Sequence, residues 1–256
     1  MKVVILAGGL GTRISEYSEQ IPKPLIEVGG KPIIHRIMKQ FARFDLTEFI
    51  VCLGYKGHLI KEYFVNQSQM RSDIEVDLAS GNVAALSQES DCNWTVKLID
   101  TGLESMTGGR LLRIKEQLSD ETFLMTYGDG LANVNLNELI DFHNALGRVA
   151  TVTAVHPAAR FGELVIDNVG VVEQFKEKPQ VNQGWINGGF FVFEPQVFDY
   201  LTDDLSILER EPLERLASDG QLAAYRHEGF WQCMDTKRDK LSLDELALQK
   251  PPPWEI

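Results

Sequence analysis

The sequence is poor in cysteine, and its three cysteines lie far apart. Cys52, Cys92 and Cys233 are odd in number, and none belongs to a C-x-x-C pair. A disulfide framework needs paired cysteines and a zinc ribbon needs C-x-x-C pairs, so neither kind of fold is supported. Isolated thiols suit a reducing compartment. We therefore expect a cytoplasmic protein.

Long apolar runs and positive charge are also scarce. The N-terminal run Val3 to Leu6 ends in glycines and is too short for a signal peptide, and no run is long enough to cross a bilayer. The 25 Lys and Arg residues face 37 Asp and Glu residues, which gives a net charge of −12. An acidic protein is repelled by a nucleic acid polymer and by an anionic membrane surface, so we expect neither as a partner. Small anionic substrates remain possible where cations cluster locally.

The apolar pattern alternates between strands and helices, with no repeat and no clear linker. It predicts an α/β fold: a Rossmann-like, mixed and mostly parallel sheet flanked by helices, with a smaller strand-rich lid. We expect one domain over residues 1–256. The predicted strands are 3–6, 49–53, 95–100, 122–130, 150–156, 163–168, 171–177 and 186–195, and the predicted helices are 30–44, 58–66, 110–118, 136–147, 211–220 and 239–248. We expect His35, in the first of these helices, to lie on the face of the helix that is exposed to solvent.

The first strand leads into the glycine-rich stretch AGGLGTR, Ala7 to Arg13. A dinucleotide fingerprint needs a third glycine where Ile14 stands, and a Walker A loop needs Gly-Lys-Ser/Thr where Gly-Thr-Arg stands. What remains is a glycine loop that ends in a cation and is followed by Pro-Lys-Pro, residues 22–24. Backbone amides of such a loop can approach phosphate oxygens, and the side chains of Arg13 and Lys23 can add two aimed positive charges. Together these features favour a nucleoside triphosphate site.

Two aspartates from distant segments are candidates for a metal site. Asp129 follows a predicted strand in TYGDG, although Gly-Asp-Gly is also a common turn. Asp235 precedes a predicted helix, where it could be a simple N-cap. Carboxylates at the ends of strands are suited to hold Mg²⁺ that also binds phosphates.

These motifs resemble those of the sugar-phosphate nucleotidyltransferases, which join a nucleoside triphosphate to a sugar 1-phosphate and release pyrophosphate. The resemblance spans nearly the whole chain and is closest to members that transfer a cytidylyl group to glucose 1-phosphate. It departs most at residues 81–94. The motifs that carry it are GGLGTR, PKP, DTGLESMTGGRL, TYGDG, RFGEL, FKEKP, WINGGFFVFEP and GFWQCMDTKRD.

The resemblance implies a reaction, its substrates and the residues that serve them. CTP and α-D-glucose 1-phosphate would give CDP-glucose and pyrophosphate, which in the family feeds the dideoxysugars of surface polysaccharides such as O antigen. Residues 1–130 would form the nucleotide half and residues 131–256 the sugar phosphate half, with Mg²⁺ as cofactor. The implied residues are Arg13 and Lys23 for catalysis; Leu6, Ala7, Gly8, Gly9, Leu10, Gly11, Thr12, Arg13, Lys23, Ser105, Thr107, Arg110 and Gly128 for the nucleotide; Asp129 and Asp235 for the metal; and Glu177, Lys178, Asn187 and Gly188 for the sugar phosphate.

Several alternatives remain open from the residues alone. Arg110 carries donors only, so it can serve O2 or N3 of cytosine but also O2 of uracil, and the cytosine amine would need a backbone carbonyl. The same chemistry with UTP, dTTP or another phosphorylated acceptor, or a non-catalytic nucleotide-sugar sensor, would fit the same fold. The polar stretch 66–93 is either an excursion with short strands such as residues 74–79 or an arm for subunit contact. The family resemblance favours a homo-oligomer.

Overall fold

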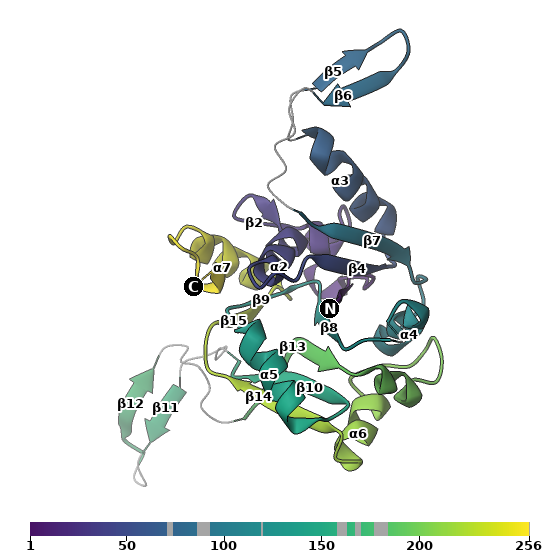
Figure 1. Ribbon diagram of the computed structural model, residues 1–256. Coiled ribbons are helices and arrows are strands. Elements are labelled where there is room, and N and C mark those ends of the chain that lie inside the picture. Colours follow the sequence, from purple (N-terminus) through teal and green to yellow (C-terminus); the bar gives the residue numbers. More distant parts are fainter. Residues whose placement is uncertain are drawn as a thin grey trace.

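A seven-stranded sheet forms the centre of the molecule (Figure 1). The computed structural model describes residues 1–70, 74–85, 93–118, 120–157, 163–166, 170–176 and 184–255. In spatial order the strands are β14 (Leu222–His227), β10 (Ala150–Val155), β13 (Ile186–Phe193), β8 (Phe123–Tyr127), β1 (Val3–Leu6), β4 (Glu48–Leu53) and β7 (Thr95–Asp100).

The sheet is mixed and mostly parallel, as the sequence predicts. The pairs β1–β4, β1–β8, β4–β7 and β10–β14 are parallel, and β13 alone runs antiparallel to both of its neighbours, β8 and β10. Strands β1, β4, β7 and β8 precede residue 130 and the other three follow it, so both halves of the chain build one continuous sheet.

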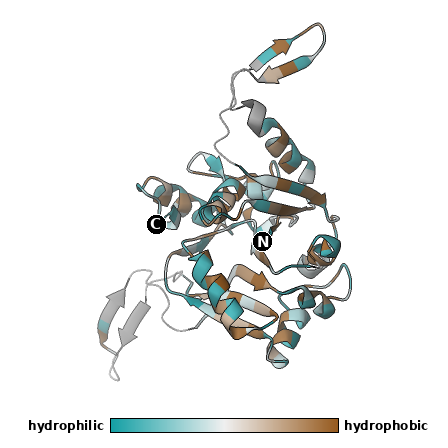
Figure 2. Ribbon diagram, viewed as in Figure 1, coloured by the Kyte–Doolittle hydropathy of each residue, from teal (hydrophilic) through white to brown (hydrophobic). Residues whose placement is uncertain are grey.

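Helices cover both faces of the sheet, and each face has its own apolar core. Along β1, Val3 and Ile5 face one core while Val4 and Leu6 face the other, as the period of two in a strand requires. Figure 2 shows these central strands as predominantly hydrophobic. The first core includes residues of α2 (Ile33–Ala42), α3 (Gly57–Met70), α5 (Leu136–Leu146) and α7 (Lys237–Ala247), and the second includes residues of α4 (Thr107–Leu112) and α6 (Glu211–Ser218).

The predicted first helix is confirmed as α2, but the expectation for His35 is wrong. Its side chain is 4% exposed, and its ring lies 4.9 Å from the ring of Trp94. The Tyr63 hydroxyl on α3 lies 3.4 Å from His35 Nδ1. Tyr63 on α3 and Trp94, which directly precedes β7, thus cover the face of α2 that carries His35. The polar residues next to His35 in the sequence had indicated that this face is exposed to solvent.

Two further differences concern boundaries and missed strands. The helix predicted at 110–118 begins three residues earlier as α4 and ends at Leu112, and a short 3-10 helix follows at Lys115–Gln117. The sequence pattern missed β14 and the pair β9 (Gly130–Ala132) and β15 (Trp231–Cys233). Small elements complete the N-terminal part: α1 (Ser15–Ser18), β2 (Glu27–Val28) and β3 (Lys31–Pro32).

Two hairpins lie outside the central sheet. Strands β5 (Ile74–Asp77) and β6 (Asn82–Ala85) pair with each other and stand away from the body beyond the end of α3 (Figure 1). Of the two alternatives left open for residues 66–93, short strands are therefore present, and a role in subunit contact is not tested by this pairing. Strands β11 (Glu163–Ile166) and β12 (Val172–Lys176) form the second hairpin, in the segment expected to be strand-rich. Within the described part of the chain, every helix is too short or too polar to span a bilayer.

Candidate nucleotidyl transfer site

The glycine loop lies at the carboxyl edge of the sheet, where open α/β sheets bind ligands. Leu6 at the end of β1 is in register with Tyr127 at the end of β8, and the amide of Gly128 donates to the Leu6 carbonyl at 3.0 Å. The loop turns at Gly11, whose φ of 65° is a left-handed conformation, and the Ser18 hydroxyl donates to the Gly11 carbonyl. This turn opens a cavity of about 560 Å³ above the ends of the two strands.

The cavity is lined by every residue that the sequence suggested for the nucleotide and the metal. These are Leu6, Ala7, Gly8, Gly9, Leu10, Gly11, Thr12, Arg13, Lys23, Ser105, Thr107, Arg110, Gly128, Asp129 and Asp235. The cavity is also lined by four residues that the sequence analysis did not suggest for the site: Pro24, Met106, Tyr127 and Glu209. No motif pointed to Glu209, because its segment reaches the cavity only through tertiary packing.

The β9–β15 pair brings the two aspartates together. Gly130 is paired with Cys233, and the amide of Met234 donates to the Asp129 carbonyl at 2.8 Å. Asp129 and Asp235 therefore flank the same end of this ladder. Asp235 is not a helix cap, since Thr236 caps α7 in a reciprocal capping box with Asp239. The Asp235 carboxylate is thus left to face the cavity.

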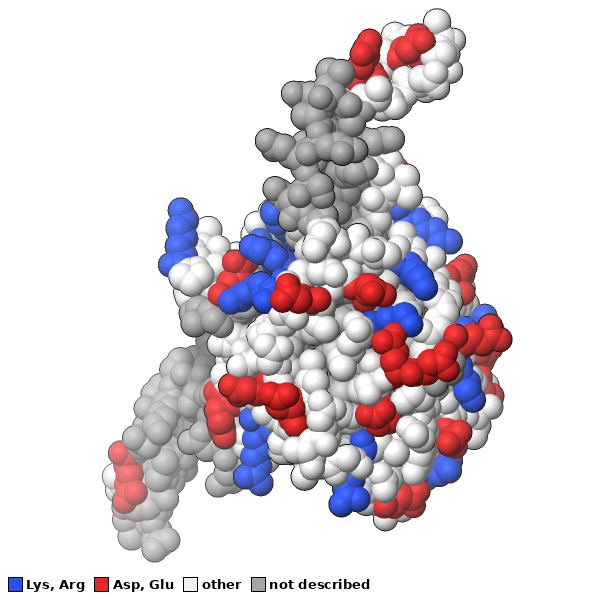
Figure 3. Space-filling model, viewed as in Figure 1, with Lys and Arg blue, Asp and Glu red and all other residues white. Residues whose placement is uncertain are grey.

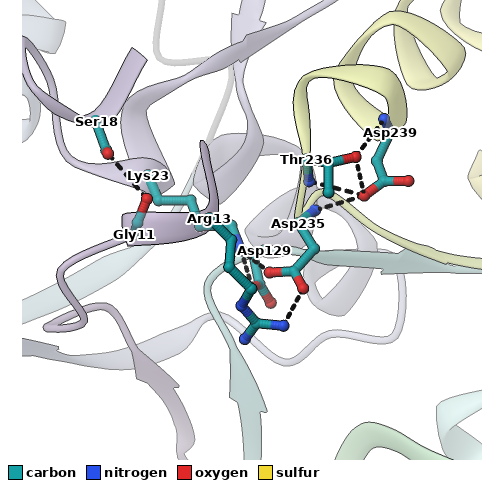
Figure 4. A network of polar contacts seen from close by, with 8 residues as sticks. All are labelled: Gly11, Arg13, Ser18, Lys23, Asp129, Asp235, Thr236 and Asp239. Atoms are coloured by element: carbon teal, nitrogen blue, oxygen red, sulfur yellow. Dashed lines mark hydrogen bonds and ion pairs between the residues drawn. The ribbon is translucent and has the colours of Figure 1, made fainter. Parts of the chain in front are cut away.

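Lys23 lies between the two carboxylates (Figure 4). Its Nζ is 2.7 Å from Asp129 Oδ2 and 2.9 Å from Asp235 Oδ1, and its side chain is only 12% exposed. Burial on its own would lower the pKa of Lys23, but the two carboxylates outweigh it and raise that pKa above its ordinary value. Arg13 pairs with the other oxygen of Asp235 while its side chain is 77% exposed. The positive charge of Lys23 is therefore fixed between two carboxylates, whereas the positive charge of Arg13 is exposed to solvent.

The carboxylate pair fits a hard divalent cation. Two carboxylate oxygens from distant segments of the chain converge on one cationic nitrogen, so the geometry already concentrates negative charge at a single point. Among the described residues no group of three or more His, Cys, Asp or Glu side chains is placed to hold a metal. Mg²⁺ characteristically takes one or two carboxylates and completes its shell with water and substrate phosphates. Asp129 and Asp235 match that pattern.

Arg110 lines the cavity, but its guanidinium is engaged with the protein. The side chain is 4% exposed and donates to the carbonyls of Leu53, Gly102, Gly8 and Leu103 and to the Thr101 hydroxyl, at 2.8–3.4 Å. Burial lowers the pKa of Arg110, although arginine remains charged at neutral pH. The Gly8 carbonyl also accepts from the Tyr55 amide. Arg110 thus ties the glycine loop to the ends of β4 and β7.

The residues suggested for the sugar phosphate are only partly described. Asn187, at the start of β13, donates through Nδ2 to the Tyr127 hydroxyl at 3.2 Å. The Gly188 carbonyl accepts from Trp231 Nε1 at 2.7 Å. Glu177 and Lys178 lie outside the described residues, as does Cys92. Tyr127 therefore connects the described sugar-side residue to the wall of the cavity.

Comparisons with known proteins identify the family of this chain. A model of the Nucleotidyl transferase family matches residues 2–232. The glucose-1-phosphate cytidylyltransferase of Salmonella typhimurium is 49% identical over 99% of this chain and 98% of that protein. The probable glucose-1-phosphate cytidylyltransferase of Bacillus subtilis is 46% identical over the full length of both. The crystal structure of HddC from Yersinia pseudotuberculosis shares the fold, with a TM-score of 0.70 at 23% identity over 95% of this chain and 98% of that one. The chain therefore belongs to the nucleotidyl transferase family.

Proposed function

We propose that the protein transfers the cytidylyl group of CTP to α-D-glucose 1-phosphate, giving CDP-glucose and pyrophosphate. The observation that carries the reaction type is the cluster of Lys23, Asp129 and Asp235 beside the glycine loop. Its charges suit a triphosphate and a divalent cation. The choice of base and sugar is supported by relatives of 46–49% identity that are named for this pair.

In this proposal CTP lies over the glycine loop. The amides of residues 8–11 approach the phosphates, and Arg13, the exposed cation at the end of the loop, stabilises the charge that develops on the departing pyrophosphate. The base lies against the exposed apolar side chains of Leu10 and Met106, which line the cavity. Arg110 shapes this wall through the carbonyls it holds, and a direct contact from it to the base would replace one of those bonds.

Asp129 and Asp235 would hold Mg²⁺. When bound, the ion supplies charge neutralisation to the triphosphate and its leaving group. Lys23 would then be free to pair with the α-phosphate, where negative charge gathers during transfer. The close pairing of Lys23 with the metal-binding carboxylates is the reason to expect this exchange of partners.

The reaction is a single in-line displacement. A phosphate oxygen of glucose 1-phosphate forms a bond to the α-phosphorus of CTP, and the bond from that phosphorus to the bridging oxygen breaks and releases pyrophosphate. The attacking oxygen is already ionised, so neither a protein nucleophile nor a strong base is required. The nearby thiol of Cys233 does not serve as a nucleophile in this proposal, because burial, together with Asp129 and Asp235, raises its pKa to about 11 and keeps it protonated.

The sugar phosphate would lie on the side of the cavity that carries Asn187 and Gly188. An asparagine side chain offers both a donor and an acceptor to sugar hydroxyls. In the same proposal Glu177 accepts from sugar hydroxyls and Lys178 anchors the phosphate, as the family resemblance implies.

The test is pyrophosphate release with Mg²⁺ and glucose 1-phosphate, comparing CTP, UTP, dTTP and ATP, with the nucleotide product identified by mass. Selective formation of CDP-glucose from CTP is expected. Faster turnover with another nucleotide would overturn the choice of base. Tight CTP binding without turnover for any acceptor would instead favour a nucleotide-sugar sensor.

We also propose that the chain forms a homo-oligomer through the β5–β6 hairpin, and that it acts in the cytoplasm to supply a nucleotide sugar for surface polysaccharide. Val76 and Val83 are cross-strand partners at 44% and 45% exposure, and Leu78 is 91% exposed. The only charges on this hairpin are Glu75 and Asp77, and Figure 3 shows its surface as mostly uncharged. An isolated two-stranded hairpin is marginally stable, so cover by a second copy would stabilise it.

A further inference from the structure

Glu209 places a carboxylate on the cavity wall that none of the motifs suggested. It lies in the segment between β13 and α6, and both of its oxygens are used. Oε1 accepts from the Tyr127 hydroxyl at 2.5 Å, and Oε2 accepts from the Thr107 hydroxyl at 2.6 Å. A carboxylate that accepts two short hydrogen bonds fixes both donors strongly, because bonds to an ionised group are about twice as strong as neutral ones.

The two hydroxyls belong to different sides of the cavity. Thr107 is the first residue of α4 and follows Ser105 and Met106, which line the nucleotide side. Tyr127 ends β8 and accepts from Asn187 Nδ2 at 3.2 Å on the sugar side. Hydrogen bonds therefore run without interruption from Thr107 through Glu209 and Tyr127 to Asn187.

Each hydrogen bond in this network from Thr107 to Asn187 has a defined donor and acceptor. The Thr107 hydroxyl donates to Glu209 and accepts from the Leu208 amide at 2.9 Å. Asn187 Oδ1 accepts from the Gly189 amide at 2.8 Å, which leaves Nδ2 to donate to Tyr127. Because the carboxylate is an acceptor only, it sets the direction of both hydroxyls, and Tyr127 then sets the orientation of the Asn187 amide.

We infer that Glu209 is a positioning residue that orients Asn187 toward the sugar phosphate through Tyr127 and holds the start of α4 through Thr107. The inference rests on the proposed function, because it takes Asn187 as the sugar-side residue and α4 as part of the nucleotide side. One carboxylate then aligns the two substrate sites with each other.

Steady-state kinetics of Tyr127→Phe test the sugar-side link. The variant keeps the ring and removes both hydrogen bonds of the hydroxyl. We expect the KM for glucose 1-phosphate to rise about tenfold, as for loss of a bond to a charged group, while the KM for CTP changes less than about twofold. Tyr200→Phe is the matched control, since the Tyr200 hydroxyl donates to Asp219 at 3.1 Å and neither residue lines the cavity.

Glu209→Gln tests whether the hydrogen bonds to Thr107 and Tyr127 act as one network. The amide can accept from only one of the two hydroxyls, so both KM values should rise, whereas Glu211→Gln, which alters an exposed pair with Arg215, should change neither. In the double variant Tyr127→Phe with Glu209→Gln, the KM for glucose 1-phosphate should rise no further than in the more affected single variant.

Three outcomes would overturn the inference while CDP-glucose formation by the wild type upholds the function. They are an unchanged KM for glucose 1-phosphate in Tyr127→Phe, equal rises in both KM values of Tyr127→Phe together with a lowered melting temperature, and multiplicative effects in the double variant. A wild type that forms no CDP-glucose would instead overturn the proposed function, and the inference with it.

Discussion

At the scale of single residues, the site is defined by one lysine held between two carboxylates. Lys23 pairs with both Asp129 and Asp235. If these carboxylates hold the metal ion, as proposed, metal and lysine would compete for the same oxygens. Metal binding would then depend on the nucleotide, whose phosphates can accept Lys23 and add ligands to the metal.

Replacing Lys23 with Met should therefore separate metal binding from turnover. We expect turnover to fall about 100-fold or more, because an aimed charge is lost from the transferred phosphate. We expect Mn²⁺, added without nucleotide, to bind more tightly than in the wild type, as measured by electron paramagnetic resonance. Lys31→Met, at an exposed position on β3, is the control for charge removal. Unchanged Mn²⁺ affinity together with wild-type turnover would remove Lys23 from the site.

Gly9 offers a test of phosphate approach that leaves the fold alone. A Cβ at this position would meet no atom within 4 Å, and its φ is not in the left-handed region. Gly9→Ala should thus keep the wild-type melting temperature. If phosphates approach the loop backbone closely, the KM for CTP should nevertheless rise about tenfold. An unchanged KM would place the triphosphate elsewhere in the cavity.

Some site residues were visible in the sequence and others were not, for a physical reason. Lys23 lies between two prolines, Asp129 lies between two glycines, and Asp235 directly precedes a predicted helix, so the local sequence pattern indicated all three. Glu209 and Tyr127 meet only because a remote loop docks on α4 and β8, and no local pattern encodes that contact. The expectation that His35 is exposed to solvent was wrong for the same reason, since Trp94, 59 positions away in the chain, covers it.

At the scale of elements, helix α4 shows how tertiary contacts set a boundary. Its first amides are capped by the loop before α6: the Met106 amide donates to the Asp204 carbonyl, and the amides of Gly108 and Gly109 donate to the Ser206 carbonyl. Two adjacent glycines are poor helix formers, which is why the sequence pattern placed the start of the helix after them. The loop carbonyls supply the missing stabilisation.

Gly109→Ala tests this docking. A Cβ at Gly109 would collide with the backbone of Asp204, so the loop would have to move away from α4. We expect the free energy of unfolding to fall by about 3 kcal/mol, measured by urea titration. Gly130→Ala, whose Cβ would meet no atom within 4 Å, should change it by less than about 1 kcal/mol. Equal stability of the two variants would contradict the docking.

Strands were predicted where their own sequence carries a strand pattern. The range predicted for β1 matches the structure, because β1 is a continuous apolar run, as expected for a central parallel strand. The range predicted for the edge strand β7 also matches, because apolar and polar residues alternate along most of its sequence TVKLID. By contrast, β14 lies at the edge of the sheet, half exposed, and its sequence LAAYRH mixes apolar and polar residues. Its place is set by pairing with β10 rather than by its own pattern.

At the scale of the whole molecule, the β5–β6 hairpin stands away from the body and leaves Val76, Leu78 and Val83 exposed. Val76→Thr combined with Leu78→Ser keeps strand propensity at position 76 and removes apolar surface from the hairpin. In sedimentation velocity we expect the wild type to run as an oligomer and this variant to shift toward the single chain. Val65→Thr, at a 66% exposed position on α3, is the control. A wild type that sediments as a single chain would contradict assembly through the hairpin.

The whole molecule also brings two halves of the chain to one cavity, and the reaction that they perform has a stereochemical signature. The measurement to make is the configuration at phosphorus after reaction of glucose 1-phosphate with CTP that carries one sulfur on the α-phosphorus, determined by ³¹P nuclear magnetic resonance. A single in-line displacement predicts a CDP-glucose analogue with inverted configuration. Retained configuration would mean two displacements and a covalent nucleotidyl-protein intermediate, which would contradict a site built from Lys23, Arg13 and two aspartates without a nucleophile.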